Sequence, residues 1–209
     1  MGINIRTNVE PLRAQRDLNA TTDRLRTAYA RLSSGLRITR AADDAAGLAI
    51  AEQLRADARI ASVAIRNAND GISIIAITDG AMNEITNSLV RMAELAEQSA
   101  NGVYSNSQRS ALQLEFAAVG SELERIAMTT EFNGMNLLVG GLEVTFQVGF
   151  DGQSNSQVSY SGVAANLAAI GLAETGSSQL SYSIMGNTES DSQVAARNAL
   201  DAINDAIGS

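Results

Sequence analysis

The 209-residue chain contains no histidine, cysteine, lysine or tryptophan. Without histidine or cysteine it cannot form the usual nucleophile–base pairs of hydrolases, or an ordinary zinc site. Without lysine it can form neither a Schiff base nor the lysine-containing phosphate loop of nucleotide hydrolases. The lack of cysteine also removes disulfide bonds as a source of stability. We therefore expect no enzyme activity, no metal and no cofactor.

Long apolar runs are missing as well. No stretch approaches the ~18 uninterrupted apolar residues that a transmembrane helix requires. The first ten residues, MGINIRTNVE, lack the apolar centre of a secretory signal. We expect a chain that does not span a membrane and does not carry a cleaved leader.

Charge is distributed unevenly along the chain. Residues 1–40 hold eight arginines and three acids, whereas the remaining residues hold seven arginines and twenty acids. A basic arm on an acidic body is compatible with nucleic-acid or anionic-membrane binding, with complementarity between neighbouring copies, or with a solvated helix face. Because the arginines alternate with acids and only Tyr29 is aromatic among them, we expect no nucleic-acid partner.

The longest helical pattern covers residues 43–100 and contains no proline. Its apolar residues recur at steps of seven, three, four, three and four, which is the narrow seam of a coiled coil. A helix of this length would span roughly 85 Å, too long for a compact domain with a radius of gyration of about 17 Å. It is therefore either the axis of a rod or broken into two helices. The seam consists of Ile75, Met82, Ile85, Leu89, Met92 and Ala96.

Two glycines interrupt this pattern. Asn69-Asp70-Gly71 and Asp79-Gly80 are turn signals, and each glycine costs about 1 kcal/mol relative to alanine within a helix. We nevertheless predict one continuous helix, because a single apolar stripe crosses Gly71. That stripe consists of Ile65, Ile72, Ile75 and Met82.

Residues 3–36 predict a preceding helix, in which Pro11 suits a first turn. Its narrow seam would need a partner helix for stability. The seam consists of Leu18, Thr22, Leu25, Tyr29, Leu32 and Leu36, and Ser33-Ser34-Gly35 predicts its end.

Residues 107–130 predict a helix capped by Ser107. The short loop before it would fold it back antiparallel on the long helix. The apolar residues of the two helices are expected to form the rod core together. They are Leu112, Phe116, Val119, Leu123 and Ile126 on this helix, and Ile75, Met82, Ile85, Leu89 and Met92 on the long helix.

From residue 137 the apolar period changes to two. Val144, Phe146, Val148 and Phe150 alternate with other residues, and Asp151-Gly152 is a turn signal. Val158 and Tyr160 follow on a return strand, so we predict a β-hairpin over about 137–162.

The remaining residues predict a short variable region, about 163–189, and a last helix from residue 190. The variable region holds a short apolar helix at 163–170 and a strand through Leu180, Tyr182 and Ile184. Ser190-x-x-Gln193 is a capping box, and the last helix carries Leu200, Ile203 and Ile207. The expected fold is mainly α with a small β region: a long antiparallel helical rod or coiled coil plus a β-hairpin.

Six segments, in order, resemble bacterial flagellin, the subunit of the flagellar filament. They are RLSSGLRITRAADDAAGLAI (31–50), RNANDGISI (66–74), GAMNEI (80–85), MAELAEQSANG (92–102), TEFNGMNLL (130–138) and VGGLEVTFQVG (139–149). The resemblance implies a self-polymerising, extracellular structural protein of the flagellum, secreted without a cleaved signal peptide. Its implied partners are its own copies, the flagellar export apparatus, and the cap and hook-associated proteins. The alternative is the hook–filament junction protein of the same superfamily.

The resemblance also implies a division into domains. Residues 1–40 would form the helix of the filament's inner tube, and residues 41–209 the helical rod domain. Leu18, Leu25, Leu32 and Leu36 would form the polymerisation seam. Flagellins end with a second long helical segment, and here the chain stops where that segment would start. We therefore expect the seam to lack its intramolecular partner, whether through truncation, processing or an incomplete natural copy.

The resemblance implies one further site. In flagellins, an arginine and a leucine on the long helix and a glutamate on the next helix contact the flagellin-sensing Toll-like receptor of animals. The matching residues are Arg91, Leu95 and Glu115, and the same patch would first serve contacts between subunits.

Paired carboxylates elsewhere suggest no catalysis. Asp43 and Asp44 point about 100° apart on a helix and suit a helix N-terminus. Glu122 is placed to pair with Arg125.

Overall fold

The computed structural model describes residues 9–208, which divide into two compact units between Ile60 and Ala61. The long helix α2 (Ala45–Ala100) belongs to both, since the boundary falls within it. It runs without a break through Gly71 and Gly80, as the apolar stripe predicts. None of the described helices is both long enough and apolar enough to cross a membrane.

The first unit contains α1 (Val9–Ser34), none of whose residues is buried. The predicted part of this helix at residues 3–8 lies outside the described residues. The four leucines of the predicted polymerisation seam are exposed: Leu18 68%, Leu25 54%, Leu32 81% and Leu36 43%. Within the described part of this unit, no helix covers the seam.

A loop at residues 35–44 joins α1 to α2. It leaves α1 through Gly35, whose φ of +67° lies in the left-handed region that favours glycine. Asp44 caps α2 by accepting a hydrogen bond from the Gly47 amide at 2.8 Å. Asp43 accepts hydrogen bonds from the Thr39 amide and hydroxyl at 3.3 and 3.2 Å, and Arg31 lies 3.7 Å away. The two carboxylates therefore serve separate structural roles.

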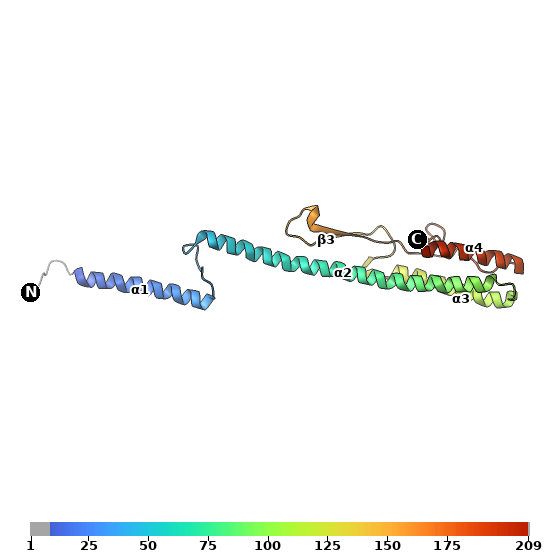
Figure 1. Cartoon of the computed structure of the whole chain (residues 1–209), viewed down its shortest axis with the longest axis horizontal. Helices are drawn as coiled ribbons and strands as arrows, with labels where there is room; N and C mark the ends of the chain where they lie inside the picture. The colour runs from blue at the N-terminus through green and yellow to red at the C-terminus, as the bar shows by residue number, and fades with distance from the viewer. Residues whose placement is uncertain (1–8, 209) are drawn as a thin grey trace, which may run out of the picture. The chain divides into compact units, whose positions relative to one another are not determined.

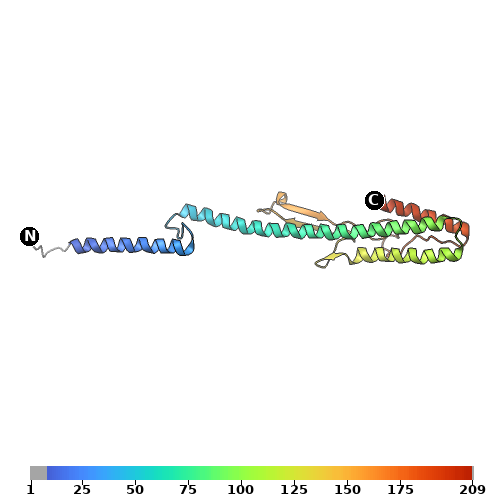
Figure 2. The ribbon, with the colours of Figure 1, turned by 60° about the horizontal axis from the view of Figure 1, so that its bottom comes forward.

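In the second unit, α3 (Asn106–Thr129) runs back along α2, and α4 (Glu189–Gly208) packs beside both (Figure 1). Figure 2 shows the same arrangement after rotation.

The predicted N-terminal caps of α3 and α4 are both wrong. Ser105, not Ser107, caps α3 in a capping box with Gln108. Thr188 accepts the Asp191 amide at 3.1 Å at the start of α4, so Ser190 lies inside the first turn.

The turn between α2 and α3 is held by Arg109, whose side chain is fully buried. Its guanidinium donates hydrogen bonds to the carbonyl oxygens of Tyr104 (3.1 Å) and Asn101 (2.9 Å). These carbonyls lie just beyond the C-terminus of α2, where a cation is also favoured by the helix dipole.

The core lies where α2, α3 and α4 meet. Ile85, Leu89, Met92, Phe116 and Leu123 are buried, and Met82, Leu112, Val119 and Ile126 are half-buried against them. Ile75 is an exception, because it is 56% exposed whereas Ile74 is 1% exposed. The buried face of α2 passes through Gly71, Ile74 and Thr78, so the core position falls one residue before the predicted one.

A β-hairpin lies over the middle of α2 (Figure 1). Its strands β3 (Glu143–Gln147) and β4 (Gln157–Ser161) are antiparallel and pair Phe146 with Val158. The 3₁₀ turn Ser154–Ser156 precedes β4. Phe150 lies beyond the strand and is 66% exposed, so the predicted strand ends sooner than its alternation suggests. A second short pair, β1 (Glu131–Phe132) and β2 (Met135–Asn136), follows α3.

The region 163–188 does not contain the helix and strand expected there. Residues 167–170 form a turn, Ala164 makes an isolated bridge to Val139, and Leu180 makes an isolated bridge to Ala173. Backbone groups here bond to nearby backbone and to helix side chains: Leu167 N–H donates to Glu124 at 2.8 Å, and Ile184 N–H donates to Gln113 at 2.7 Å. Because these groups are already satisfied, the segment needs no regular structure of its own.

The neighbouring isoleucines 74 and 75 provide a matched test of the core. We expect Ile74→Ala to lower the free energy of unfolding by about 2–5 kcal/mol, the cost of deleting a buried side chain. Ile75→Ala removes an exposed side chain and should cost less than about 1 kcal/mol. Urea unfolding of both variants, monitored by circular dichroism, measures the two free energies of unfolding. Equal losses in the two variants would contradict the assignment of Ile74, and not Ile75, to the core.

A second prediction concerns pH. The hydrogen bond from the Thr39 amide, followed by the Thr39 hydroxyl and the charge of Arg31, lowers the pKa of Asp43 below 3.8. Asp43 therefore stabilises the loop fully above about pH 4, and this contribution is lost as pH falls through the lowered pKa. We expect the urea midpoint of Asp43→Asn to fall less than that of the wild type between pH 5 and pH 2.5.

Carboxyl NMR titration of Asp43 checks the cause directly. Thr39→Val removes the hydroxyl donor and keeps the amide, so the pKa of Asp43 should move part of the way back toward 3.8. An unchanged pKa in this variant would contradict the side-chain contribution.

Candidate functional site: the α2–α3 surface and the helical seams

The structure brings Arg91 of α2 and Glu115 of α3 together across the two helices. Arg91 Nε and Nη2 both donate to Glu115 Oε1, at 3.0 and 2.5 Å, and Nη1 donates to Glu94 Oε2 at 2.9 Å. Both side chains of the cross-helix pair remain about half exposed. The antiparallel fold of α3 on α2 is what places residues 24 positions apart in contact.

The electrostatics of this surface follow from the ion pairs. Hydrogen bonds to Glu115 and then Glu94 raise the pKa of Arg91. Further along α3, the predicted Glu122–Arg125 pair is present, with Arg125 Nε 2.7 Å from Glu122 Oε2. Hydrogen bonding to Arg125 lowers the pKa of Glu122, and the same bond raises the pKa of Arg125. These groups are fixed in their charged forms, which suits recognition rather than proton transfer.

Leu95 does not share this surface. It is 1% exposed and belongs to the core, because the buried face of α2 passes through Met92, Leu95 and Ala96 at this level of the helix. Its side chain is therefore not accessible beside Arg91 and Glu115 in this structure, although the resemblance groups the three residues in one contact site. The exposed large apolar side chains nearest in sequence to the ion pair are Val90 (46%) and Leu114 (73%).

The structure also reveals a surface that the sequence reasoning missed. A second apolar seam faces outward on α2, with steps of four, three, four and three. Ile65 and Ile72 are each 63% exposed, and Ile75 is 56% exposed. The outward seam consists of Ala61, Ile65, Ala68, Ile72 and Ile75. Its signal is present in the sequence as the stripe that crosses Gly71, of which Ile75 was predicted to lie in the core.

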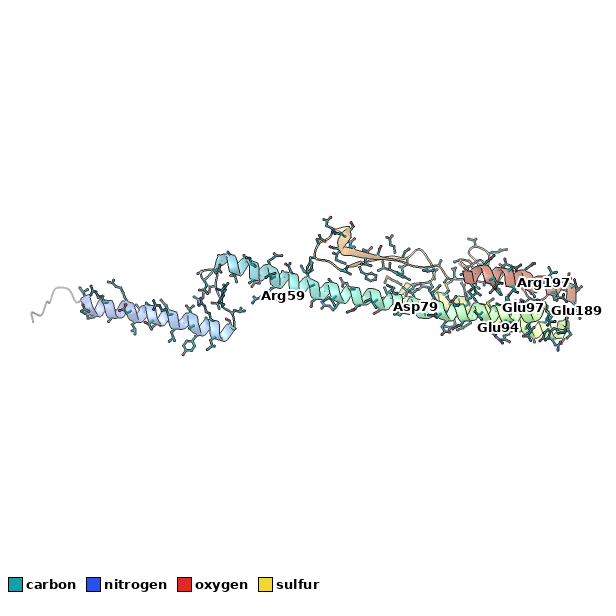
Figure 3. All side chains as sticks on the ribbon, viewed as in Figure 1. Arg59, Asp79, Glu94, Glu97, Glu189 and Arg197 are labelled. Atoms are coloured by element: carbon teal, nitrogen blue, oxygen red, sulfur yellow. The ribbon has the colours of Figure 1, made fainter. Side chains whose placement is uncertain are left out.

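No acidic cluster in residues 9–208 could hold a metal ion with three or more ligands. Figure 3 shows labelled charged side chains of α2 and α4, among them Glu94, Glu97 and Arg197, projecting from the helices. With charged pairs on its surface and two exposed apolar seams, the arrangement is suited to binding other helices.

Comparison with known proteins agrees with this architecture. The sequence model of the bacterial flagellin N-terminal helical region matches residues 5–142. Flagellin B of Vibrio anguillarum is 47% identical over 172 residues, covering 82% of this chain and 46% of that protein. Flagellin A of Vibrio cholerae is 54% identical over 150 residues, covering 71% and 40%.

A further relative and a solved structure also match this chain. Polar flagellin F of Vibrio parahaemolyticus is 45% identical over 195 residues, covering 93% of this chain and 50% of that protein. The chain thus spans about half the length of the curated relatives it matches. The crystal structure of Bacillus cereus flagellin shares the fold, with a TM-score of 0.54 at 22% identity over 68% of this chain and 75% of that one. From the extent of these matches, the chain belongs to the bacterial flagellin family.

Proposed function

We propose that this chain is a structural subunit of the bacterial flagellar filament, exported from the cell and polymerised through its helical seams. The family assignment supports this role. The observation that carries it is the exposure of α1: a 26-residue helix with an apolar seam and no buried residue. Since isolated helices gain most of their stability from packing, such a helix requires a partner.

The polymerisation seam is the part of α1 that would meet this partner. Leu18, Leu25 and Leu32 are spaced by seven residues and lie on one face of the helix. Covering one such leucine removes enough apolar surface to contribute about 1.5–3 kcal/mol. A repeating interface of many copies adds this gain at every contact, which favours a polymer.

The further partners follow from the same role: the export apparatus, which delivers the subunit, and the cap and hook-associated proteins at the ends of the filament. The named relatives reported above are flagellins. No feature of residues 9–208 favours the hook–filament junction alternative.

We also propose that Arg91 and Glu115 form a contact between subunits, and that the flagellin-sensing Toll-like receptor binds the same surface. The support is geometric, since the pair is held in one orientation by three hydrogen bonds and remains half exposed. A preformed arginine–carboxylate pair loses little side-chain freedom when it is bound.

Seeded growth tests the filament role. We expect wild-type subunits to sediment with sheared filament fragments, and Leu25→Asp to sediment about tenfold less, because a charge would be buried in the interface. Ala20→Asp introduces the same charge on the opposite, exposed face of α1 and should sediment like the wild type. Equal sedimentation of the two variants would rule out the seam as the polymerisation surface.

Receptor signalling tests the second surface. Arg91→Ala and Glu115→Ala in intact subunits should each lower signalling by about tenfold, as expected for a central interface residue. Arg125→Ala breaks a different exposed ion pair of α3 and serves as the control. The hypothesis fails if the first two variants signal like the wild type.

A further inference from the structure

The chain contains two Asn-Gly dipeptides. Asn101-Gly102 lies in the loop that joins α2 to α3, and Asn133-Gly134 lies between β1 and β2 (Figure 1). Asparagine followed by glycine is prone to lose its side-chain ammonia, because glycine leaves the next backbone nitrogen sterically free to attack the carboxamide. All four residues are exposed, so water reaches both sites. The structure nevertheless surrounds the two asparagines differently.

The side-chain carbonyl of Asn101 is polarised by a backbone amide. Val103 N–H donates a hydrogen bond to Asn101 Oδ1 at 3.2 Å. When a nucleophile attacks Cγ of Asn101, negative charge develops on this oxygen, and a donor that already points at it stabilises that charge. The Val103 amide therefore acts on Asn101 as an oxyanion-hole donor acts in acyl transfer.

The attacking atom, the nitrogen of Gly102, belongs to a peptide unit that Arg109 contacts. Arg109 Nη2 donates to the Asn101 carbonyl oxygen at 2.9 Å, and this carbonyl and the Gly102 N–H form one peptide unit. Within residues 9–208, the Gly102 N–H donates to no acceptor. The Arg109 side chain is charged and fully buried, so it stabilises the anion that forms when this N–H loses its proton.

Asn133 has neither contact. It begins the two-residue turn between β1 and β2, across which Phe132 pairs with Met135. Asn133 and Gly134 both have positive φ, 50° and 76°, as in the tight turns that close hairpins. No hydrogen bond of the described residues involves the Asn133 side chain. Closing a ring from Cγ onto the Gly134 nitrogen also requires the backbone to rotate out of this turn.

We propose that the α2–α3 turn promotes deamidation of Asn101. The Gly102 N–H gives its proton to solvent hydroxide, and the nitrogen forms a bond to Cγ of Asn101. The bond between Cγ and Nδ2 breaks, and ammonia leaves with a proton from water, which gives a cyclic imide. Water then opens either carbonyl of the imide to give aspartate or isoaspartate. The net change is one water consumed and one ammonia released.

Arg109 also suits the isoaspartate product. In isoaspartate the main chain continues through Cγ, so the former backbone carbonyl of residue 101 becomes a free carboxylate. This is the group that Arg109 already bonds through Nη2, and Arg109 Nη1 is buried without a partner among the described residues. A carboxylate beside a guanidinium makes a stronger, charge-assisted hydrogen bond than a neutral carbonyl does.

The two asparagines can be compared within one molecule. Trypsin separates them, because it cleaves after arginine and leaves Asn101 in peptide 92–109 and Asn133 in peptide 126–197. After incubation of the full chain at mildly alkaline pH, tandem mass spectrometry of these peptides measures the deamidated fraction at each asparagine. We expect a several-fold larger fraction at Asn101 in the folded chain, and similar fractions in concentrated urea. A folded chain in which Asn133 reacts as fast as Asn101 would overturn the proposal.

Removing each contact tests its contribution. Val103→Pro deletes the amide that polarises Asn101 and replaces a side chain that is 79% exposed. Arg109→Met removes the guanidinium and keeps an unbranched side chain in the buried site. Each variant should slow deamidation at Asn101 several-fold and leave Asn133 unchanged. Arg125→Met removes an exposed guanidinium elsewhere on α3 and should change neither rate.

The remaining outcomes are also decisive. Faster reaction at Asn101 in Arg109→Met, with Asn133 unchanged, would show that the guanidinium protects the turn and would overturn the proposal. If Asn133 in this variant instead reacts at its rate in urea, the variant is unfolded, and Val103→Pro decides. An undiminished rate at Asn101 in Val103→Pro, with wild-type circular dichroism, overturns the proposal. The reaction is measured on unassembled chains, so the result does not depend on the proposed filament role.

Discussion

An α-helix has a narrow surface, and each apolar stripe along it must be covered by a neighbour. α2 carries two such stripes. One passes through Ile74, Ile85 and Met92 and is covered by α3, α4 and the hairpin. The other passes through Ile65, Ile72 and Ile75 and is exposed. The packing of the second unit thus accounts for only one of the two faces that the sequence of α2 encodes.

The covered and the exposed stripes of α2 differ in what they contribute to the fold. The covered stripe and the polar contacts of Arg109, Glu124 and Gln113 hold the second unit together within one copy. The exposed stripe and the seam of α1 contribute little burial within the described residues, so their apolar character is not explained by the packing of either unit. Monomeric soluble proteins rarely expose large continuous apolar patches, so these two stripes are the surfaces on which the proposed assembly depends.

The sequence predicted the helices well, because seven-residue spacing persists over many turns and continues through Gly71 and Gly80. It misplaced Ile75 and Leu95 because α2 carries apolar residues on more than one face. The sequence does not show which of these faces the neighbouring elements cover. Thr78 is buried by Tyr160 from a strand 82 residues away, which no local pattern of α2 contains. The segment 163–188 was predicted wrongly for the same reason, since distant side chains such as Ser99 of α2 and Gln113 of α3 bond to its backbone.

Gly71 connects the two stripes physically. In the middle of a helix it costs about 1 kcal/mol relative to alanine, and the Phe146 ring packs directly over it, in van der Waals range of an added Cβ at 3.4 Å. The same ring packs against the core on one side and, together with Ile72 and Ile75, lines an exposed cleft on the other. Displacing Phe146 would therefore disturb the core and the cleft together. The cleft is thus not an independent addition to the fold, because the Phe146 ring belongs both to its lining and to the packing of the hairpin on the core.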